Sequence, residues 1–377
     1  MKTKIISVFL VSIVILWVFF VFLKTGSAEN KQIVPVQDLS NHPIYSNYKF
    51  SKAEGVINIG VQPLYFPTGL ITETMTRDTV LSEALNRLGL GIRFYSFLKG
   101  DDVNFFLRQG DIEVGIGGDM PAITVAANLE VVIPILIQQG FTSIIANSHM
   151  LIKELRGKDI GYAFGSNAHY ALLSTLESNG LSEDEVNLIP MEVIEMPDAL
   201  HTGKIAAFSA WEPTATASLM KYPESVAIHR CLSSGYMYFQ KTLLDKHSEA
   251  VYQIVASEIR AIQWMQCNKR NLLQASKWAI EASKSIAAKR IGLSAEQNAD
   301  LAKNDILGLK SVPKIPQNDL KQNGPLHREF EFLKTLGKIS SSINWDKIQD
   351  SFDPQIINEV LTNSKKYKLN EFIYDIE

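Results

Sequence analysis

Cysteine is scarce in this sequence: Cys231 and Cys267 are the only two among 377 residues. Two cysteines cannot build a disulfide scaffold or a zinc site that relies on cysteine. They could pair with each other in an oxidising compartment, or remain as two buried free thiols. Basic charge is not in excess either, since 37 lysines and arginines face 40 aspartates and glutamates. We therefore expect no binding to nucleic acid.

Signatures of catalysis and of nucleotide binding are missing as well. The sequence has no GxSxG, HExxH or GxGxxG string and no phosphate loop ending in GK[ST]. Residues 115–119 (GIGGD) resemble part of a dinucleotide turn, but the third glycine is absent and Asp119 would repel a pyrophosphate. We therefore expect a protein that is not an enzyme, with no catalytic residue, no cofactor and no metal site.

Long apolar runs are absent except at residues 5–23, which carry no charge and are followed by small residues at 26–28. The run is longer than the apolar core of a typical signal peptide, about 7 to 15 residues, and close to the roughly 20 of a membrane helix. Residues 1–28 are therefore predicted to be a signal peptide or a membrane anchor. Either way we expect a periplasmic or otherwise extracytoplasmic protein, tethered to the inner membrane only if residues 5–23 are retained.

After a polar lead-in over residues 29–50, short apolar strands alternate with helices. Strands are predicted at 56–61, 92–97, 112–116, 131–137, 159–162, 186–189 and 205–208. Helices are predicted at 68–88, 101–109, 120–128, 150–155, 168–177, 196–201, 250–267, 272–289, 295–306 and 328–336. This alternation predicts an α/β fold with parallel βαβ layers. Two such units followed by a long helical part suggest two lobes with a ligand cleft between them.

Candidate binding residues lie where strands hand over to helices, because α/β proteins bind ligands at the carboxyl ends of their strands. The first handover carries Gln62 and Tyr65, although a plain loop whose aromatics cap the core would look the same. The second carries Gly118, Asp119 and Met120. Asp119 is expected to be a helix N-cap, and capping alone or capping with close approach of the glycine backbone to a ligand would explain the motif.

The third handover, residues 165–170 (GSNAHY), contains Ser166, Asn167, Ala168 and His169. The N–H groups and the dipole of a helix start can bind a small anion there, helped by the Ser166 hydroxyl and by His169. Alternatively Ser166 only caps the helix and His169 is a surface or core histidine. The fourth handover offers Trp211 for stacking on a ligand, or as a core residue, and Glu212 for bridging the lobes or contacting a ligand amine.

Several strings resemble, in order and spacing, the solute-binding proteins of ABC importers for aliphatic sulfonates, taurine and nitrate. They are INIGVQ, LRQGDIEVGIGGDMPAI, IKELRGKDIGYAFGSNAHYALLSTLESNGL and KIAAFSAWEP, within residues 56–264. GSNAHY is the most specific, because this family typically has Gly-Ser-x-Ala-His at the start of a helix in the second lobe. Two features depart from the family: Glu212 stands in place of the usual aspartate of Trp-Asp-Pro, and Met120 in place of a small polar residue.

The resemblance implies a two-lobed type II periplasmic-binding-protein fold with a ligand cleft between the lobes and a helical C-terminal part. Lobe 1 would comprise residues 51–146 and 240–377, and lobe 2 residues 147–239, with crossovers near 141–147 and 235–239. It carries over as ligand contacts Gln62 with its loop, Gly118 to Met120, Ser166 to His169, Trp211 with Glu212, and Tyr236 at the return crossover.

The resemblance also implies a function: capture of a small anionic organic solute, sulfonate-like, by lobe closure and its delivery to an ABC importer permease. The bulk of Met120 favours a solute with an organic tail over bare nitrate. The alternatives are a binding protein for nitrate or for a pyrimidine thiamine precursor, and a membrane-tethered solute sensor. A related pyrimidine synthase would need a cysteine-rich run, which is missing here. We expect a monomer.

Overall fold

The computed structural model describes residues 38–287, 292–305 and 313–376. Residues 1–28, predicted to be a signal peptide or anchor, lie outside this part, as does most of the lead-in at 29–50. In the described remainder of the lead-in, Tyr45–Asn47 form a 3₁₀ turn, η1. Among the described residues, no helix is both long enough and apolar enough to cross a membrane.

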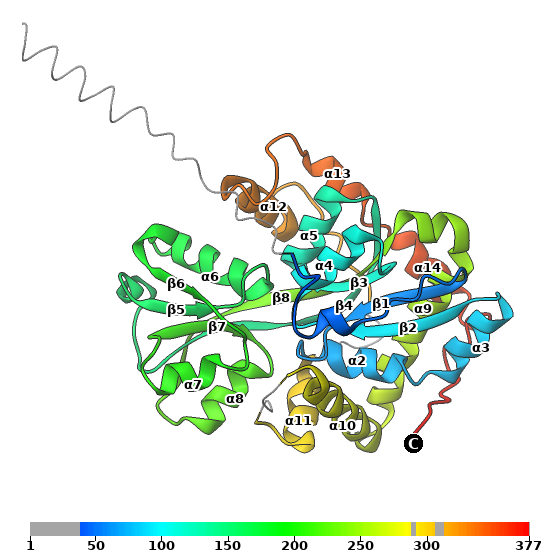
Figure 1. Ribbon diagram of the computed structural model, residues 1–377, viewed down its shortest axis with the longest axis horizontal. Helices are drawn as coiled ribbons and strands as arrows, with labels where there is room; N and C mark the ends of the chain where they lie inside the picture. The colour runs from blue at the N-terminus through cyan, green and yellow to red at the C-terminus, as the bar shows by residue number, and fades with distance from the viewer. Residues whose placement is uncertain (1–37, 288–291, 306–312, 377) are drawn as a thin grey trace, which may run out of the picture. The chain divides into compact units, whose positions relative to one another are not determined.

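One eight-stranded sheet, in the order β2-β1-β3-β8-β4-β7-β5-β6, runs through the fold (Figure 1). β1 pairs in parallel with β2 and β3, and β5 pairs in parallel with β6 and β7, so each end of the sheet has the predicted parallel layers. The strands are β1 (Val56–Val61), β2 (Gly91–Ser96), β3 (Val114–Gly118), β4 (Val131–Ala146), β5 (Asp159–Tyr162), β6 (Asn187–Pro190), β7 (Ala207–Trp211) and β8 (Val226–Gln240).

Two long antiparallel strands, β4 and β8, connect the two parallel groups. β3 pairs with residues 235–239 of β8, whereas β7 pairs with residues 142–146 of β4. The crossovers predicted at 141–147 and 235–239 therefore fall on or beside these strands. The prediction ended the fourth strand at residue 137 and missed β8 as a strand, because the half-exposed stretch at 226–232 mixes polar and apolar residues without a clean alternation.

Most of the predicted helices are present, with several corrections. The helix expected at 150–155 is only a 3₁₀ turn, the one expected at 250–267 begins at Lys241, and helices at 214–221, 345–350 and 354–362 were not predicted. The helix expected over 68–88 is two helices, because Asp78 caps a new helix by accepting the Leu81 N–H at 3.2 Å. The helices are α2 (Thr68–Met75), α3 (Thr79–Arg87), α4 (Gly100–Gln109), α5 (Asp119–Asn128), α6 (Asn167–Ser178), α7 (Met196–His201), α8 (Thr214–Lys221), α9 (Lys241–Cys267), α10 (Lys269–Ile286), α11 (Ala295–Asp305), α12 (Pro325–Thr335), α13 (Trp345–Asp350) and α14 (Pro354–Thr362). Two further 3₁₀ turns are η2 (Ile152–Leu155) and η3 (Glu183–Glu185).

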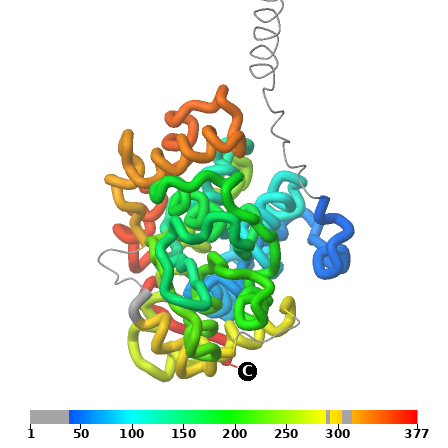
Figure 2. The backbone as a smooth tube through the Cα atoms, turned by 90° about the vertical axis from the view of Figure 1, so that its left-hand side faces the viewer, coloured from blue at the N-terminus to red at the C-terminus, as the bar shows by residue number. Residues whose placement is uncertain are grey.

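Two large apolar clusters cover opposite faces of the β1-β3 end of the sheet. One packs α2, α9 and α10 against strand residues such as Ile59, and the other packs α5, α12 and α13 together through Ile123, Phe330 and Ile348. The views agree: α12 and α13 (orange) lie at the end opposite α10 and α11 (yellow) (Figures 1 and 2). The C-terminal helices are thus built into the first half of the fold, and α12 lies next to α5.

Candidate solute-binding site

Ser166 caps helix α6, as the sequence predicted. Its Oγ accepts the His169 N–H at 3.3 Å and donates to the Ala163 carbonyl at 2.6 Å. Asn167, the first residue of the helix, donates from Nδ2 to the Tyr65 hydroxyl at 3.0 Å and to the Ser234 carbonyl at 3.2 Å. The start of α6 is therefore tied to the loop after β1 and to β8.

His169 is a buried, neutral side chain. It is 1% exposed, lies against the rings of Tyr162 and Phe164, and accepts the Gly165 N–H on Nδ1 at 3.4 Å. Burial, together with the positive charges of Lys338 and Lys99, lowers the pKa of His169 to about 3. Nε2 then carries the proton and has no hydrogen-bond partner within the described part of the chain. His169 is thus a core histidine that brings no positive charge and lines neither of the two spaces described below.

The prediction that Asp119 caps a helix is wrong. Gly118 is the N-cap of α5 and Asp119 is its first residue. The Asp119 carboxylate accepts N–H groups of Met120 at 3.1 Å and Ser234 at 3.0 Å. Burial raises its pKa to about 6, against the opposing effect of these hydrogen bonds. The buried carboxylate thus links the start of α5 to β8, while Met120 is buried in the core.

Position 118 requires glycine, because the side chain of Asn167 lies very close to its backbone. A Cβ built on it would lie 1.5 Å from Oδ1 of Asn167, so only glycine leaves room for that amide. The glycine therefore accommodates a side chain of the protein itself, where the sequence had suggested close approach of a ligand. Ala168, next to Asn167, is fully buried and its carbonyl accepts the Ser209 hydroxyl at 2.8 Å.

The two predicted aromatic residues, Tyr65 after β1 and Trp211 at the end of β7, are in contact. Trp211 donates from Nε1 to the Leu64 carbonyl at 2.9 Å, and its ring lies edge to face with Tyr65 at 6.0 Å. The Gln62 amide donates to the Ile116 carbonyl. The Glu212 carboxylate accepts the Thr216 N–H at 3.0 Å and lies 3.7 Å from Arg230, so it is already engaged within its own half of the fold.

Six of the predicted contact residues surround one small gap. Its volume is about 10 Å³, about the minimum that a single water needs. The structure brings these predicted side chains together, but they contact one another and leave no room between them for an organic solute. These six are Gln62, Tyr65, Gly118, Ser166, Asn167 and Trp211.

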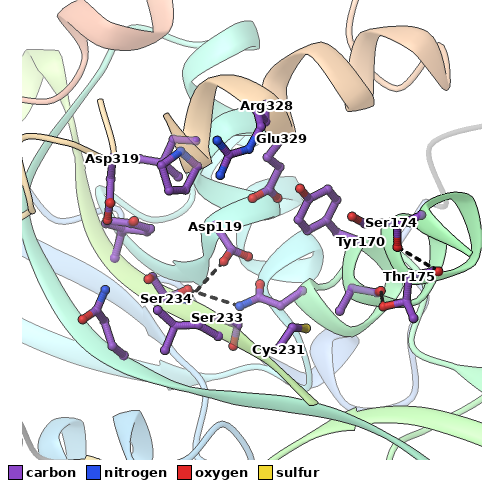
Figure 3. Close-up of a pocket in the computed structure, with 18 of the residues that line it drawn as sticks. Asp119, Tyr170, Ser174, Thr175, Cys231, Ser233, Ser234, Asp319, Arg328 and Glu329 are labelled. Atoms are coloured by element: carbon purple, nitrogen blue, oxygen red, sulfur yellow. Dashed lines mark hydrogen bonds between the residues drawn. The ribbon is translucent and has the colours of Figure 1, made fainter. Parts of the chain in front are cut away.

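A cavity of about 340 Å³ lies beside this gap and shares Asn167 with it (Figure 3). Of the other predicted residues, Asp119 and Tyr236 line it. α6, β8, the start of α5 and the C-terminal segment with α12 form its walls. Its lining is Asp119, Gln139, Asn167, Tyr170, Ala171, Ser174, Thr175, Ser178, His229, Cys231, Leu232, Ser233, Ser234, Tyr236, Asp319, Pro325, Leu326, Arg328 and Glu329.

Acidic groups outnumber basic ones in this lining: three carboxyls, Asp119, Asp319 and Glu329, accompany the guanidinium of Arg328. The sequence analysis missed Glu329. The sequence does contain a sign of its role: Glu329 lies on the apolar face of α12, where Leu326, Phe330 and Leu333 are buried. An acid at such a position needs a partner or a ligand, because burying an unpaired charge is costly.

Both cysteines lie in the described part of the chain. Cys231 and Cys267 are both free, but Cys231 is half-buried and Cys267 is exposed, so the expectation that both free thiols are buried is wrong. Burial raises the pKa of Cys231 to about 12, which keeps it a thiol beside the cavity. Across the described ranges, no three His, Cys, Asp or Glu side chains gather closely enough to hold a metal ion.

The chain resembles known binding proteins in sequence. Residues 106–272 match the NMT1/THI5-like family model. The chain is 26% identical to the taurine-binding periplasmic protein of Escherichia coli (strain K12) over 188 residues, covering 46% of this chain and 58% of that protein. It is 24% identical over 220 residues to a protein of Bacillus subtilis (strain 168) named as an aliphatic sulfonates-binding protein, covering 56% of this chain and 65% of that protein. The matches thus span less than two thirds of these relatives.

Solved structures show that the chain is also similar in fold to known proteins. The alkanesulfonate-binding protein SsuA from Xanthomonas axonopodis pv. citri superimposes with a TM-score of 0.60 at 14% identity, covering 80% of this chain and 99% of that one. The desulfurization enzyme DszB shares the fold as well, with a TM-score of 0.51 at 16% identity, covering 82% of this chain and 99% of that one. The predicted two-lobed periplasmic-binding-protein fold is confirmed. Residues 106–272 are thus similar to the NMT1/THI5-like family, and the chain shows distant similarity to taurine- and aliphatic-sulfonate-binding proteins.

Proposed function

We propose that this chain is the extracytoplasmic solute-binding component of an ABC importer, which captures a small organic solute of the sulfonate class and delivers it to a membrane permease. The observation that carries the proposal is the polar cavity of about 340 Å³. Its walls come from α5 and α12 on one side and from α6 on the other, and its size is that of a small-molecule site. The distant relationship to taurine- and aliphatic-sulfonate-binding proteins supports the choice of solute.

The proposed lobes are residues 51–146 with 240–377, and residues 147–239. The anionic end of the solute binds at the start of α6, where first-turn N–H groups lack partners within the helix and the Ser166 hydroxyl lies beside them. Closure of the lobes completes the site, and the permease distinguishes the closed from the open protein.

We propose binding without turnover. Cys231 is the one thiol along the cavity within the described residues, and its raised pKa leaves it a weak nucleophile. Ser166 is engaged with Ala163 and His169, and the carboxylates of Asp119 and Glu212 accept backbone N–H groups. These groups hold the site together and are not arranged as a nucleophile with its base.

Isothermal titration of the purified protein against organosulfonates, nitrate and pyrimidine thiamine precursors tests the proposal. We expect an organosulfonate to bind. Ser166→Ala should weaken it by about 1 kcal/mol, the difference between a hydrogen bond to a charged group and the bond that the Ser166 hydroxyl gives to the Ala163 carbonyl without solute. Asn268→Ala removes a helix cap far from the site, where Asn268 accepts the Asn271 N–H, and should leave the affinity unchanged. Binding of nitrate alone, or unchanged affinity in Ser166→Ala, would contradict the proposal.

A further inference from the structure

We propose that Tyr45, in the segment before the first strand, is a positioning residue for solute capture, because its hydroxyl group fixes the part of lobe 1 on which residues 165–167 of lobe 2 close. This inference rests on the proposed function, in which the two lobes close on a solute. It gives a role to residues 38–50, the described part of the predicted lead-in, which lie outside the stretch at 106–272 that matches the family model.

Tyr45 is anchored in the core of the proposed lobe 1. Its side chain is 2% exposed, although it belongs to a segment rich in polar residues. Its ring lies 5.1 Å from the ring of Phe97 and edge to face with that of Phe106 at 5.6 Å, within the apolar cluster that also packs α5 and α12. Close packing on several sides holds the ring in place, so the hydroxyl group can act as a fixed support.

The hydroxyl group of Tyr45 bridges the two ends of a short stretch, residues 98–102. It accepts the Leu98 N–H at 2.9 Å and donates to Oδ2 of Asp102 at 2.6 Å, and both hydrogen bonds are buried. Leu98 lies before α4, and Asp102 lies in the first turn of this helix. The bridge therefore fixes residues 99–101, which lie between its two partners.

Residues 100 and 101 are where lobe 1 faces the start of α6. The Asp101 side chain packs against the backbone of Gly165, since a Cβ built on Gly165 would lie 2.7 Å from the Asp101 Cβ. Gly100 lines the small gap together with Ser166 and Asn167. The position of residues 99–101 therefore determines how closely the two proposed lobes can approach each other.

The start of α4 lacks the usual local support. Its N-cap residue is Lys99, whose ammonium group cannot accept an N–H group of the first turn, whereas Ser166 caps α6 with its own side chain. Without the hydroxyl group of Tyr45, the first turn of α4 would sample more positions, and a smaller fraction of the protein would present residues 99–101 where lobe 2 closes. The apparent affinity for a solute falls in proportion to that fraction.

Tyr45→Phe tests this inference, because it removes the hydroxyl group and keeps the ring. Tyr48→Phe is the matched control: the ring of Tyr48 contacts that of Tyr45, but its hydroxyl group donates to the Ser96 carbonyl at the end of β2. In isothermal titration with ethanesulfonate, we expect Tyr45→Phe to weaken binding about threefold or more and Tyr48→Phe to stay within about twofold of the native protein. Asp102→Ala removes the acceptor of the same hydroxyl group and should have the same effect as Tyr45→Phe, should that variant fail to fold.

Hydrogen exchange of the solute-free protein, followed by mass spectrometry, separates positioning from simple stabilisation of lobe 1. Tyr45→Phe should speed exchange at residues 98–102 and also at residues 165–170 of lobe 2, and Tyr48→Phe should change neither stretch. A change confined to lobe 1 would overturn the inference. Unchanged affinity of both Tyr45→Phe and Asp102→Ala for ethanesulfonate would also overturn it and leave the proposed function standing. Faster exchange at residues 165–170, in a protein that binds no ethanesulfonate, would support the positioning role and contradict the sulfonate class.

Discussion

Glu258 lies in α9 with no exposed surface, and neither of its carboxyl oxygens has a hydrogen-bond partner in the described parts of the chain. Burial raises its pKa well above 4.5, so the folded protein holds it protonated. A buried polar group without a partner costs about 1–3 kcal/mol. We expect Glu258→Met, which keeps the side-chain length and removes both oxygens, to raise the free energy of unfolding at pH 7 by about this amount, measured by urea denaturation.

The pH dependence checks the cause of that gain. The unfolded chain loses the Glu258 proton near pH 4.5, whereas the folded chain retains it to higher pH, so raising the pH above 4.5 favours unfolding of the native sequence. Glu258→Met lacks this effect, and its advantage should therefore grow between pH 4 and pH 7. Glu281→Met, on the exposed side of α10, serves as control and should stay within about 0.5 kcal/mol of the native protein. An advantage that is constant with pH would refute the raised pKa.

Single residues were predictable where the cause is local. The cap at Ser166 follows from its place before a helical period, and the structure confirms it. The role of Gly118 was not predictable, because sequence spacing cannot tell that Asn167, far along the chain, occupies the space beside it. The place of Glu329 in the cavity lining was not predictable for the same reason, because no local pattern shows that α12 lies beside α6 and β8.

At the scale of elements, a buried ion pair joins α3, α9 and the C-terminal segment. Asp78 Oδ2 accepts Arg260 Nε at 2.9 Å and Nη2 at 2.6 Å, and Arg260 Nη1 donates to the Tyr367 carbonyl at 2.8 Å. Both side chains are fully buried. Asp78→Asn would leave Arg260 as an uncompensated buried charge and remove charge from the α3 cap. We expect a loss of about 3–5 kcal/mol in the free energy of unfolding, measured by denaturant titration.

A matched pair on the surface provides the control for Asp78→Asn. Asp245 and Lys241 form an exposed ion pair at 2.6 Å within α9. Asp245→Asn should cost less than about 1 kcal/mol, because water screens exposed pairs. Similar losses for both variants would show that the buried pair contributes no more than a surface one.

The bounds of helices and strands were predictable where the hydrophobic periodicity is strong. They were less predictable where tertiary contacts determine the local conformation. β1, β5 and α7 begin and end at the predicted residues. The division between α2 and α3 depends on Asp78, whose carboxylate is fixed by Arg260 about 180 residues later as well as by the local cap. β8 has a half-exposed first half, and its strand conformation comes from pairing with β4 along nearly its whole length.

At the scale of the whole molecule, alternating strands and helices were enough to predict two α/β units with a cleft. The sequence pattern could not predict that α12, from the C-terminal part, forms a wall of the cavity, because helical periodicity does not identify a packing partner. The contribution of this helix depends on the apolar cluster that packs it against α5 and α13.

The two proposed lobes are held together by hydrogen bonds around the predicted contact residues, which predicts a closing motion. The Leu64 carbonyl accepts from Trp211, the Glu212 carbonyl accepts the Phe66 N–H at 3.1 Å, and Asn167 donates to Tyr65. Because the gap among these residues holds only about 10 Å³, a solute that reaches the start of α6 has to enter through a more open arrangement. Solute binding and these hydrogen bonds then favour the same closed state.

Asn167→Ala removes the hydrogen bonds to Tyr65 and to Ser234, and we expect it to shift the solute-free protein toward the open state. Small-angle X-ray scattering should give a larger radius of gyration for Asn167→Ala than for the native protein. Adding a sulfonate that binds should not raise the radius of gyration of the native protein. Asn187→Ala removes an exposed side-chain hydrogen bond to Asp159, away from the proposed lobe contacts, and should leave the radius of gyration unchanged. If Asn167→Ala scatters like the native protein with and without solute, the hydrogen bonds around Asn167 do not control closure, and capture of the solute must proceed without the motion proposed here.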